Sequence, residues 1–300
     1  MSKEPGNVTV ELAEDVCALP LARRLAALLD RDPAQLREGQ PLPRGWHVML
    51  FNLPTRQSQL RADGAAHLGV TLPDIGLPRL MMGGRQIRFT GDLPLGAHVR
   101  RETRQGEVQL KNGRSGRFAL VKVEHSIFVE GTDRAAVVET TDYVLREANP
   151  PSAPATAAPA ATPAATPATA AATAAATVAP HPGTPTPAPD AVRTITPDER
   201  TLFRYSAITD NPHRIHYDLA YATGTEGYPA LVVNGSIPAM FLLELFRATA
   251  GREPQTFASR NVAPMFCGQA LTLCARAEGS DWHLWAQDPR GSTTFDARAT

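Results

Sequence analysis

The middle of the chain contains a low-complexity segment that restricts how the rest can fold. Residues 149–190 are mostly alanine, proline and threonine, with no aromatic residue and with Val178 as the only large apolar side chain. Such a segment cannot bury enough surface to offset the entropy that ordering would remove. We therefore predict a disordered linker stiffened by proline, with one folded segment on each side, residues 1–148 and 191–300.

Charge, cysteines and hydropathy exclude several classes of protein. Thirty Lys and Arg residues balance thirty Asp and Glu residues, so no basic field is available for a nucleic acid or an anionic membrane. The three cysteines are widely spaced without a CxxC pair, which argues against a disulfide framework and a zinc site. The N-terminus lacks the apolar core of a signal peptide, and the longest apolar run, GSIPAMFLLELF, is too short to span a membrane. We expect a soluble cytoplasmic protein.

The first folded segment combines one helical pattern with several strand-like stretches. In PLARRLAALLDRD, Leu21, Leu25, Leu28 and Leu29 share one face, which predicts an amphipathic helix. The alternating or β-rich stretches that follow are WHVMLFNL, RQIRFTGDL, HVRRETRQGEVQL, GRFALVKVEHSIFVEG and AAVVETTDYVLRE. KNGRSG between two of them is a strong hairpin-turn signal.

The second folded segment repeats this plan. GSIPAMFLLELFRATAG is apolar on all sides, which predicts a buried helix with Ser236 as its N-cap, Pro238 in its first turn and Gly251 after its end. The short strands expected after it are ASRNVAPMF, QALTLCARAEG, DWHLWAQDPRG and STTFDARAT. One helix accompanied by antiparallel strands, present twice, predicts an α+β fold in which each sheet wraps a helix.

Three stretches of the second segment contain residues suited to chemistry. TDNPHRIHYD holds His213 and His216, whose imidazoles titrate near neutrality and suit acid/base work, although each alone fits a solvated polar turn. Metal binding by the two is poorly supported, because no third ligand is evident. YPALVVNGS opens onto the buried helix, whose N-terminal N–H groups suit a polarised oxygen, and RNVAPMF contains Arg260, which suits a carboxylate or phosphate.

Taken together and in this order, these stretches resemble the MaoC-like hydratase/dehydratase superfamily. RYSAITDNPHRIHYD, YPALVVNGSIPAMFLLELF, RNVAPMF and LWAQDPRG look most similar to its type-2 hydroxyacyl-thioester dehydratase branch, which includes mesaconyl-C4-CoA hydratases. PLPRGWHVMLFNLP, LPRLMMGGRQIRFTGDLPLG and KNGRSGRFALVKVEHSI are similar to the N-terminal half of such proteins. The resemblance implies a double hot-dog fold, with residues 1–148 as a non-catalytic module and 191–300 as the catalytic one.

The resemblance also implies catalytic roles. Such enzymes add water to a 2-enoyl thioester, or remove it, without metal or other cofactor. The family histidine falls on His216, because Tyr217-Asp218 matches the residues that normally follow it. The backbone N–H of Gly235 is the implied donor to the thioester oxygen, with Asn234 where histidine is often found.

The carboxylate that usually accompanies this histidine is replaced. Its position, five residues ahead of His216, falls on Asn211, the usual residue in the type-2 branch, and an amide cannot accept a proton from water. We expect His216 to transfer protons and Asn211 to hold the water or the product hydroxyl. Asp210 and His213 are the alternates.

The implied substrate is an acyl-CoA thioester, in particular a short, branched, dicarboxylic one such as mesaconyl-C4-CoA or itaconyl-CoA. A second carboxylate would need a cation, for which Arg214 and Arg260 are the candidates. The first segment offers further arginines, although surface arginines are commonly just solvated: Arg79, Arg85, Arg88 and Arg114. The alternatives left open are a dehydratase for ordinary acyl chains on CoA or acyl carrier protein, a hot-dog thioesterase, and a non-catalytic acyl-CoA-binding scaffold. The sequence does not determine the oligomeric state, and a homodimer is one possibility.

Overall fold

A computed structural model describes residues 10–52, 54–65, 75–77, 79–113, 116–147 and 188–300. The strands, in chain order, are β1 (Val10–Val16), β2 (Arg79–Phe89), β3 (His98–Gly113), β4 (Gly116–Val129), β5 (Val137–Arg146), β6 (Ala191–Ile195), β7 (Thr256–Asn261), β8 (Leu271–Glu278), β9 (Asp281–Gln287) and β10 (Thr293–Ala299). The α-helices are α1 (Leu19–Leu28), α2 (Glu199–Ile208), α3 (Leu219–Gly224) and α4 (Ser236–Ala250). None of the helices in this part of the chain is long and apolar enough to cross a bilayer.

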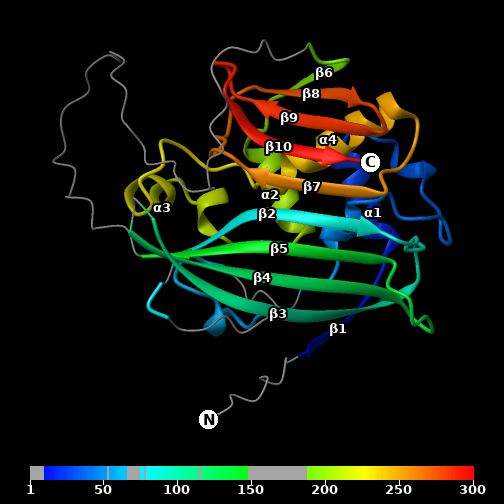
Figure 1. Ribbon diagram of the computed structural model, residues 1–300, viewed down its shortest axis with the longest axis horizontal. Helices are drawn as coiled ribbons and strands as arrows, with labels where there is room; N and C mark the ends of the chain where they lie inside the picture. Colours follow the sequence, from blue (N-terminus) through cyan, green and yellow to red (C-terminus); the bar gives the residue numbers. More distant parts are fainter. Residues whose placement is uncertain (1–9, 53, 66–74, 78, 114–115, 148–187) are drawn as a thin grey trace.

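The strands form one antiparallel sheet in the order β1-β3-β4-β5-β2-β7-β10-β9-β8-β6 (Figure 1). The first five come from the N-terminal half of the chain and the last five from the C-terminal half. The halves are joined where β2 pairs with β7, with Arg85 opposite Ser259 and Ile87 opposite Phe257. The predicted linker falls almost entirely on residues 148–187, which lie outside the described residues.

The helix α4 is buried along most of its length. Ten of its fifteen residues are buried, and it packs on β8, β9 and β6. It ends as predicted, at Gly251 with φ +68°, a left-handed conformation that glycine adopts without steric cost. The predicted N-cap is wrong by one residue: Gly235 is the N-cap and Ser236 is the first helical residue.

The stretch WHVMLFNL is not the predicted strand. Trp46–Met49 is a single 3₁₀ turn. In such a turn residues three apart lie on the same side, so Trp46 and Met49 are both buried. Gly45 precedes it with φ +94°, and a Cβ at Gly45 would overlap Leu243 of α4. The predicted amphipathic helix is confirmed as α1, with Leu25 and Leu28 buried and Leu21 partly buried.

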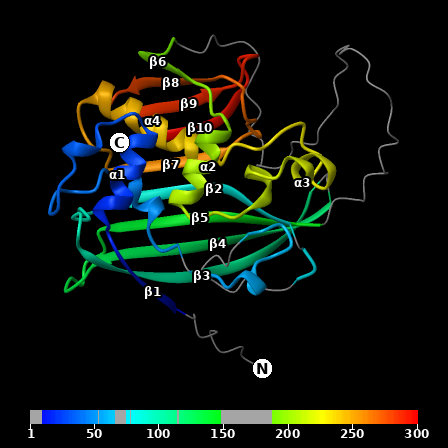
Figure 2. The ribbon, with the colours of Figure 1, turned by 180° about the vertical axis from the view of Figure 1, so that it is seen from behind.

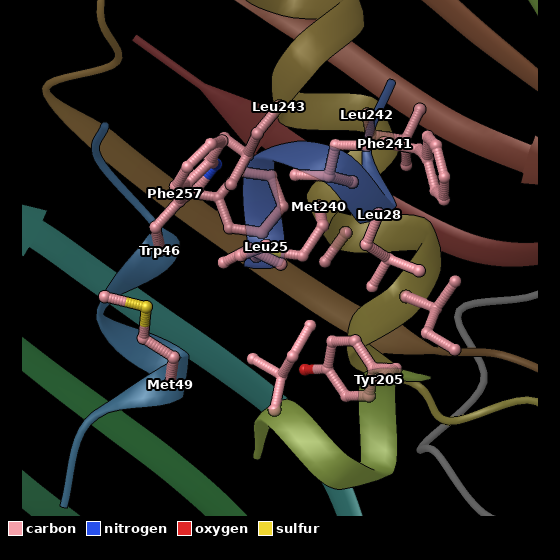
Figure 3. Close-up of a cluster of buried hydrophobic side chains, with 14 of the residues drawn as sticks. Leu25, Leu28, Trp46, Met49, Tyr205, Met240, Phe241, Leu242, Leu243 and Phe257 are labelled. Atoms are coloured by element: carbon pink, nitrogen blue, oxygen red, sulfur yellow. The ribbon is translucent and has the colours of Figure 1, made fainter. Parts of the chain in front are cut away.

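The halves share one hydrophobic core. The helices α1, α2 and α4 cover the same face of the sheet, toward the viewer in Figure 2. Figure 3 shows Leu25 and Leu28 of α1, and Trp46 of the 3₁₀ turn, gathered with Tyr205 of α2 and residues of α4. Because side chains from both halves bury one another, neither half can expose this face to water without losing much of its apolar burial.

Candidate active site

The polar stretch identified in the sequence forms the connection between α2 and α3. The helix α2 is N-capped by Asp198, whose Oδ1 accepts a hydrogen bond from Thr201 N at 2.9 Å. After α2 the chain turns at Asp210, which has φ +42°, and then forms a 3₁₀ turn over Arg214–His216. Asp218 ends the connection as the N-cap of α3, accepting from Tyr221 N at 3.0 Å. Asp218 thus fixes the end of the histidine-bearing turn, whereas Asp198 caps the far end of α2.

His216 is buried and its tautomer is fixed. Its Nδ1 lies 2.7 Å from the backbone oxygen of Val232. A carbonyl can only accept, so Nδ1 carries the proton and Nε2 of the neutral ring is an acceptor. Burial lowers the pKa of His216 to about 4, with a smaller contribution from His213 and against the opposing effect of the Val232 hydrogen bond. His216 is therefore a neutral base at physiological pH.

The segment that holds His216 ends at the start of α4. Val232 precedes Gly235 by three residues, and within the described structure no acceptor is bonded to Gly235 N–H. The first N–H groups of a helix lack intrahelical partners and favour a negative or polarised oxygen. A Cβ on Gly235 would lie 2.7 Å from Oδ1 of Asn261, so a side chain at this position would force Asn261 to shift. Close approach, rather than an unusual φ, favours glycine here.

A pocket of about 370 Å³, including its open mouth, lies beside Gly235. Its walls are the start of α4 and the inner faces of β2, β7 and β10, with Met240 and Phe257 among its apolar residues. Asn261 also lines it, and the described residues offer no partner for its buried Oδ1. Polar atoms of α4 and β7 and apolar side chains therefore meet at one opening.

Arg85 contributes a cation to the same pocket. It lies on β2 two residues before Ile87. Residues two apart in a strand share one face of the sheet, and both of these side chains face the pocket. A bulge in β2 between Met82 and Gly84 shifts the alternation by one residue, which brings Met82 to the pocket as well.

The other sequence-predicted residues surround the turn in different ways. His213 contacts His216 edge to face, with ring centroids 5.5 Å apart, and burial lowers its pKa. The Oδ1 of Asn211 accepts from His213 N at 3.1 Å, and that of Asn234 accepts from Ser236 N at 3.2 Å. Asp210 is exposed.

The two arginines proposed for a carboxylate already have acidic partners. Arg214 donates to Asp218 Oδ2 at 2.8 Å and lies over the ring of Tyr221, 4.0 Å from its centroid. Arg260 is 53% exposed and pairs with Asp296. It projects from the face of β7 opposite to that of its neighbour Asn261.

A second buried polar cluster was not predicted. His47 of the 3₁₀ turn donates from Nε2 to Glu139 Oε2 on β5 at 2.9 Å, and Thr141 donates to Glu139 Oε1 at 3.1 Å. Arg85 Nε lies 3.0 Å from the same Oε1. Burial alone would raise the pKa of Glu139, but Arg85 and the His47 hydrogen bond hold it well below its usual range. Glu139 is therefore ionised.

Comparison with known proteins identifies the family. Residues 45–267 match the family profile of hydroxyacyl-thioester dehydratase type 2. The chain is 38% identical, over 96% of its own length and 94% of the relative's, to mesaconyl-C(4)-CoA hydratase of Chloroflexus aurantiacus. It is 37% identical to the mitochondrial hydroxyacyl-thioester dehydratase type 2 of Schizosaccharomyces pombe, over 29% of this chain and 30% of that protein.

Solved structures agree on the fold. A MaoC-like dehydratase from Phytophthora capsici superposes with a TM-score of 0.66 at 12% identity, covering 98% of this chain and 95% of that one. HtdX of Mycobacterium tuberculosis gives 0.63 at 17% identity, covering 97% and 99%. A further M. tuberculosis protein, described as having a double hot-dog fold, gives 0.54 at 15% identity, covering 98% and 96%. The predicted double hot-dog class is thus confirmed, and the chain belongs to the hydroxyacyl-thioester dehydratase type 2 family, as a hydro-lyase of the hydratase/dehydratase type.

Proposed function

We propose that this protein is an enoyl-CoA hydratase that adds water reversibly to a short, branched, dicarboxylic 2-enoyl-CoA such as mesaconyl-C4-CoA or itaconyl-CoA. The observation that supports it most is the placement of His216. Its imidazole is bonded through Nδ1 to the segment that leads into Gly235, so the base and the helix N-terminus are held by one stretch of chain. The near full-length similarity to a mesaconyl-C(4)-CoA hydratase supports the acyl group.

The proposed reaction needs one base and one oxyanion donor. The thioester oxygen accepts a hydrogen bond from Gly235 N–H. His216 Nε2 removes a proton from water as its oxygen bonds to Cβ, and the electrons of the C=C bond move to give an enolate on the thioester oxygen. The imidazolium then returns a proton to Cα, which restores the thioester carbonyl. One preorganised donor is worth roughly 3–4 kcal/mol in such a step, and acid/base assistance about 10²–10⁴ in rate.

The remaining groups would position the substrate. Asn211 is proposed to hold the attacking water, through its amide N–H₂ group, while its Oδ1 stays bonded to His213 N. The N-terminal half is proposed as a non-catalytic module that supplies the acyl pocket with Met82 and Arg85.

The function is tested by offering the protein a panel of enoyl-CoAs and following the loss of enoyl-thioester absorbance. We expect turnover of mesaconyl-C4-CoA and a clearly lower kcat/KM for crotonyl-CoA and trans-2-hexenoyl-CoA. Fastest hydration of the longest neutral chain would instead indicate a dehydratase of ordinary acyl chains. Release of free thiol from a saturated acyl-CoA would indicate a thioesterase, and binding without turnover a scaffold.

Replacing Gly235 with alanine keeps the backbone N–H but is expected to lower kcat up to about 10²-fold, the effect of moving one oxyanion donor out of position. The added Cβ would lie within 3.0 Å of both amide atoms of Asn261, so either Asn261 or the start of α4 must move. Steady-state kinetics on mesaconyl-C4-CoA provide the measurement. Gly224→Ala is the matched control, because its Cβ would meet nothing within 4 Å. Equal kcat in the two variants would remove Gly235 from the oxyanion site.

A further inference from the structure

Arg85 occupies a position in the pocket that no role assigned so far requires. It lines the same pocket as Gly235 and Ser236 of the α4 start and as Asn261 of the neighbouring strand β7. The wall belongs to β2, which is held against β7 by backbone pairing on both sides of Arg85. An acyl group whose carbonyl bonds to Gly235 N–H would therefore extend into a space that a guanidinium also faces.

An ion pair places the guanidinium beside Glu139. Its Nε lies 3.0 Å from Glu139 Oε1, without the geometry of a hydrogen bond, and only 15% of the Arg85 side chain is exposed. Glu139 is in turn fixed by His47 and Thr141. The side chain is thus preorganised, and a ligand that bound it would lose little additional rotamer entropy.

The other edge of the guanidinium is poorly satisfied. Its Nη2 contacts Met82 Sδ at 3.6 Å, a weak acceptor, and Nη1 has no acceptor among the described residues. Glu139 accepts hydrogen bonds from His47 and Thr141 but only forms an ion pair with Arg85, so it compensates the guanidinium only in part. Two adjacent N–H groups facing a pocket form the fork that binds a carboxylate in bidentate geometry.

We propose that Arg85 is the specificity-determining residue that binds the free carboxylate of the acyl group. The ligand class is a short 2-enoyl-CoA that carries a carboxylate at or next to Cβ. This inference rests on the proposed hydratase function. It replaces Arg214 and Arg260 in that role, since those two are paired with Asp218 and Asp296.

The test compares two substrates that differ only in the carboxylate. Mesaconyl-C4-CoA and 3-methylcrotonyl-CoA have the same branched skeleton, with a methyl group in place of the carboxylate in the second. In Arg85→Met, kcat/KM for mesaconyl-C4-CoA is expected to fall about 10²–10³-fold, the range for truncating a buried charge partner, and that for 3-methylcrotonyl-CoA less than 5-fold. Arg88→Met, on the outer face of the same strand, is the control and should change neither.

A binding measurement covers the case in which Arg85→Met folds poorly. Arg85→Lys keeps the charge but not the fork, and its affinity for methylsuccinyl-CoA, measured by calorimetry, should fall at least 10-fold while that for isovaleryl-CoA stays unchanged. Equal losses for the charged and neutral ligands would overturn the inference and leave Arg85 a structural residue. If the unmodified protein hydrates neither substrate, the proposed hydratase activity itself fails; if it hydrates both equally well, the hydratase activity stands, but the dicarboxylic acyl group and the role of Arg85 fail.

Discussion

Replacing His216 with glutamine is expected to lower kcat for hydration by two to four powers of ten, the range for removing a general base. Glutamine retains an N–H that can donate to Val232 O but has no group that accepts a proton near neutrality. Initial-rate assays of mesaconyl-C4-CoA hydration measure the change in kcat. The fold should be kept, so the melting temperature serves as a check that the loss is chemical.

His98→Gln is the matched control for this substitution. His98 is an exposed histidine at the start of β3, and the same chemical change there should leave kcat within 2-fold, as expected of a surface position remote from the pocket. A His216→Gln protein with near-normal kcat would contradict the assignment of the base and would favour His213 or Asp210.

The pH dependence follows from the same residue. The base must be unprotonated, so kcat/KM should be flat through neutrality and should fall only as the pH approaches the folded pKa of about 4. That limb lies in the range of ordinary carboxylates, so the neighbouring Asp210 must be checked: Asp210→Asn should keep the limb if His216 causes it. Between pH 6.5 and about 4 the unfolded chain binds a proton at this histidine that the folded protein does not, so the free energy of unfolding should also decrease as the pH falls through this window.

Replacing Glu139 with leucine is expected to lower the free energy of unfolding by about 3–5 kcal/mol, because Arg85 would remain buried without its carboxylate. The hydrogen bonds from His47 and Thr141 would be lost as well. Urea or thermal unfolding measures the effect.

Two further variants make this prediction specific. Glu124→Leu, at an exposed position on β4, should change stability by no more than about 0.5 kcal/mol. The double variant Glu139→Leu with Arg85→Met should regain much of the loss, since a buried pair replaced by apolar side chains is often neutral. A single variant as stable as the native protein would mean that water or a bound anion already compensates Arg85.

Helices and strands were predicted well where a local sequence pattern, such as an apolar run or a terminal glycine, determines them. The helix α4 follows from an apolar run and its C-terminal end from Gly251, and four short strands of the C-terminal half were also predicted. The 3₁₀ turn at Trp46–Met49 could not be predicted in this way, because its conformation depends on the contact between Gly45 and Leu243, two hundred residues apart along the chain.

The site was harder to predict than the fold. The turn around His216 is local and therefore visible in the sequence, whereas the ion pair of Arg85 with Glu139 forms only when β2 and β5 are in register. In the stretch RNVAPMF, Arg260 was predicted to bind a carboxylate because of its charge, but Asn261 is the residue that lines the pocket. Which of two adjacent strand residues faces a pocket depends on the packing of the whole sheet.

The pairing of β2 with β7 also determines how the two halves are held together. The backbone ladder and the common core join the two halves directly. With the roles proposed for His216 and Arg85, the chain would correspond to a fused heterodimer, in which one half transfers protons and the other half varies the shape and charge of the acyl pocket. Substrate range could then diverge through β2 without disturbing the chemistry at α4.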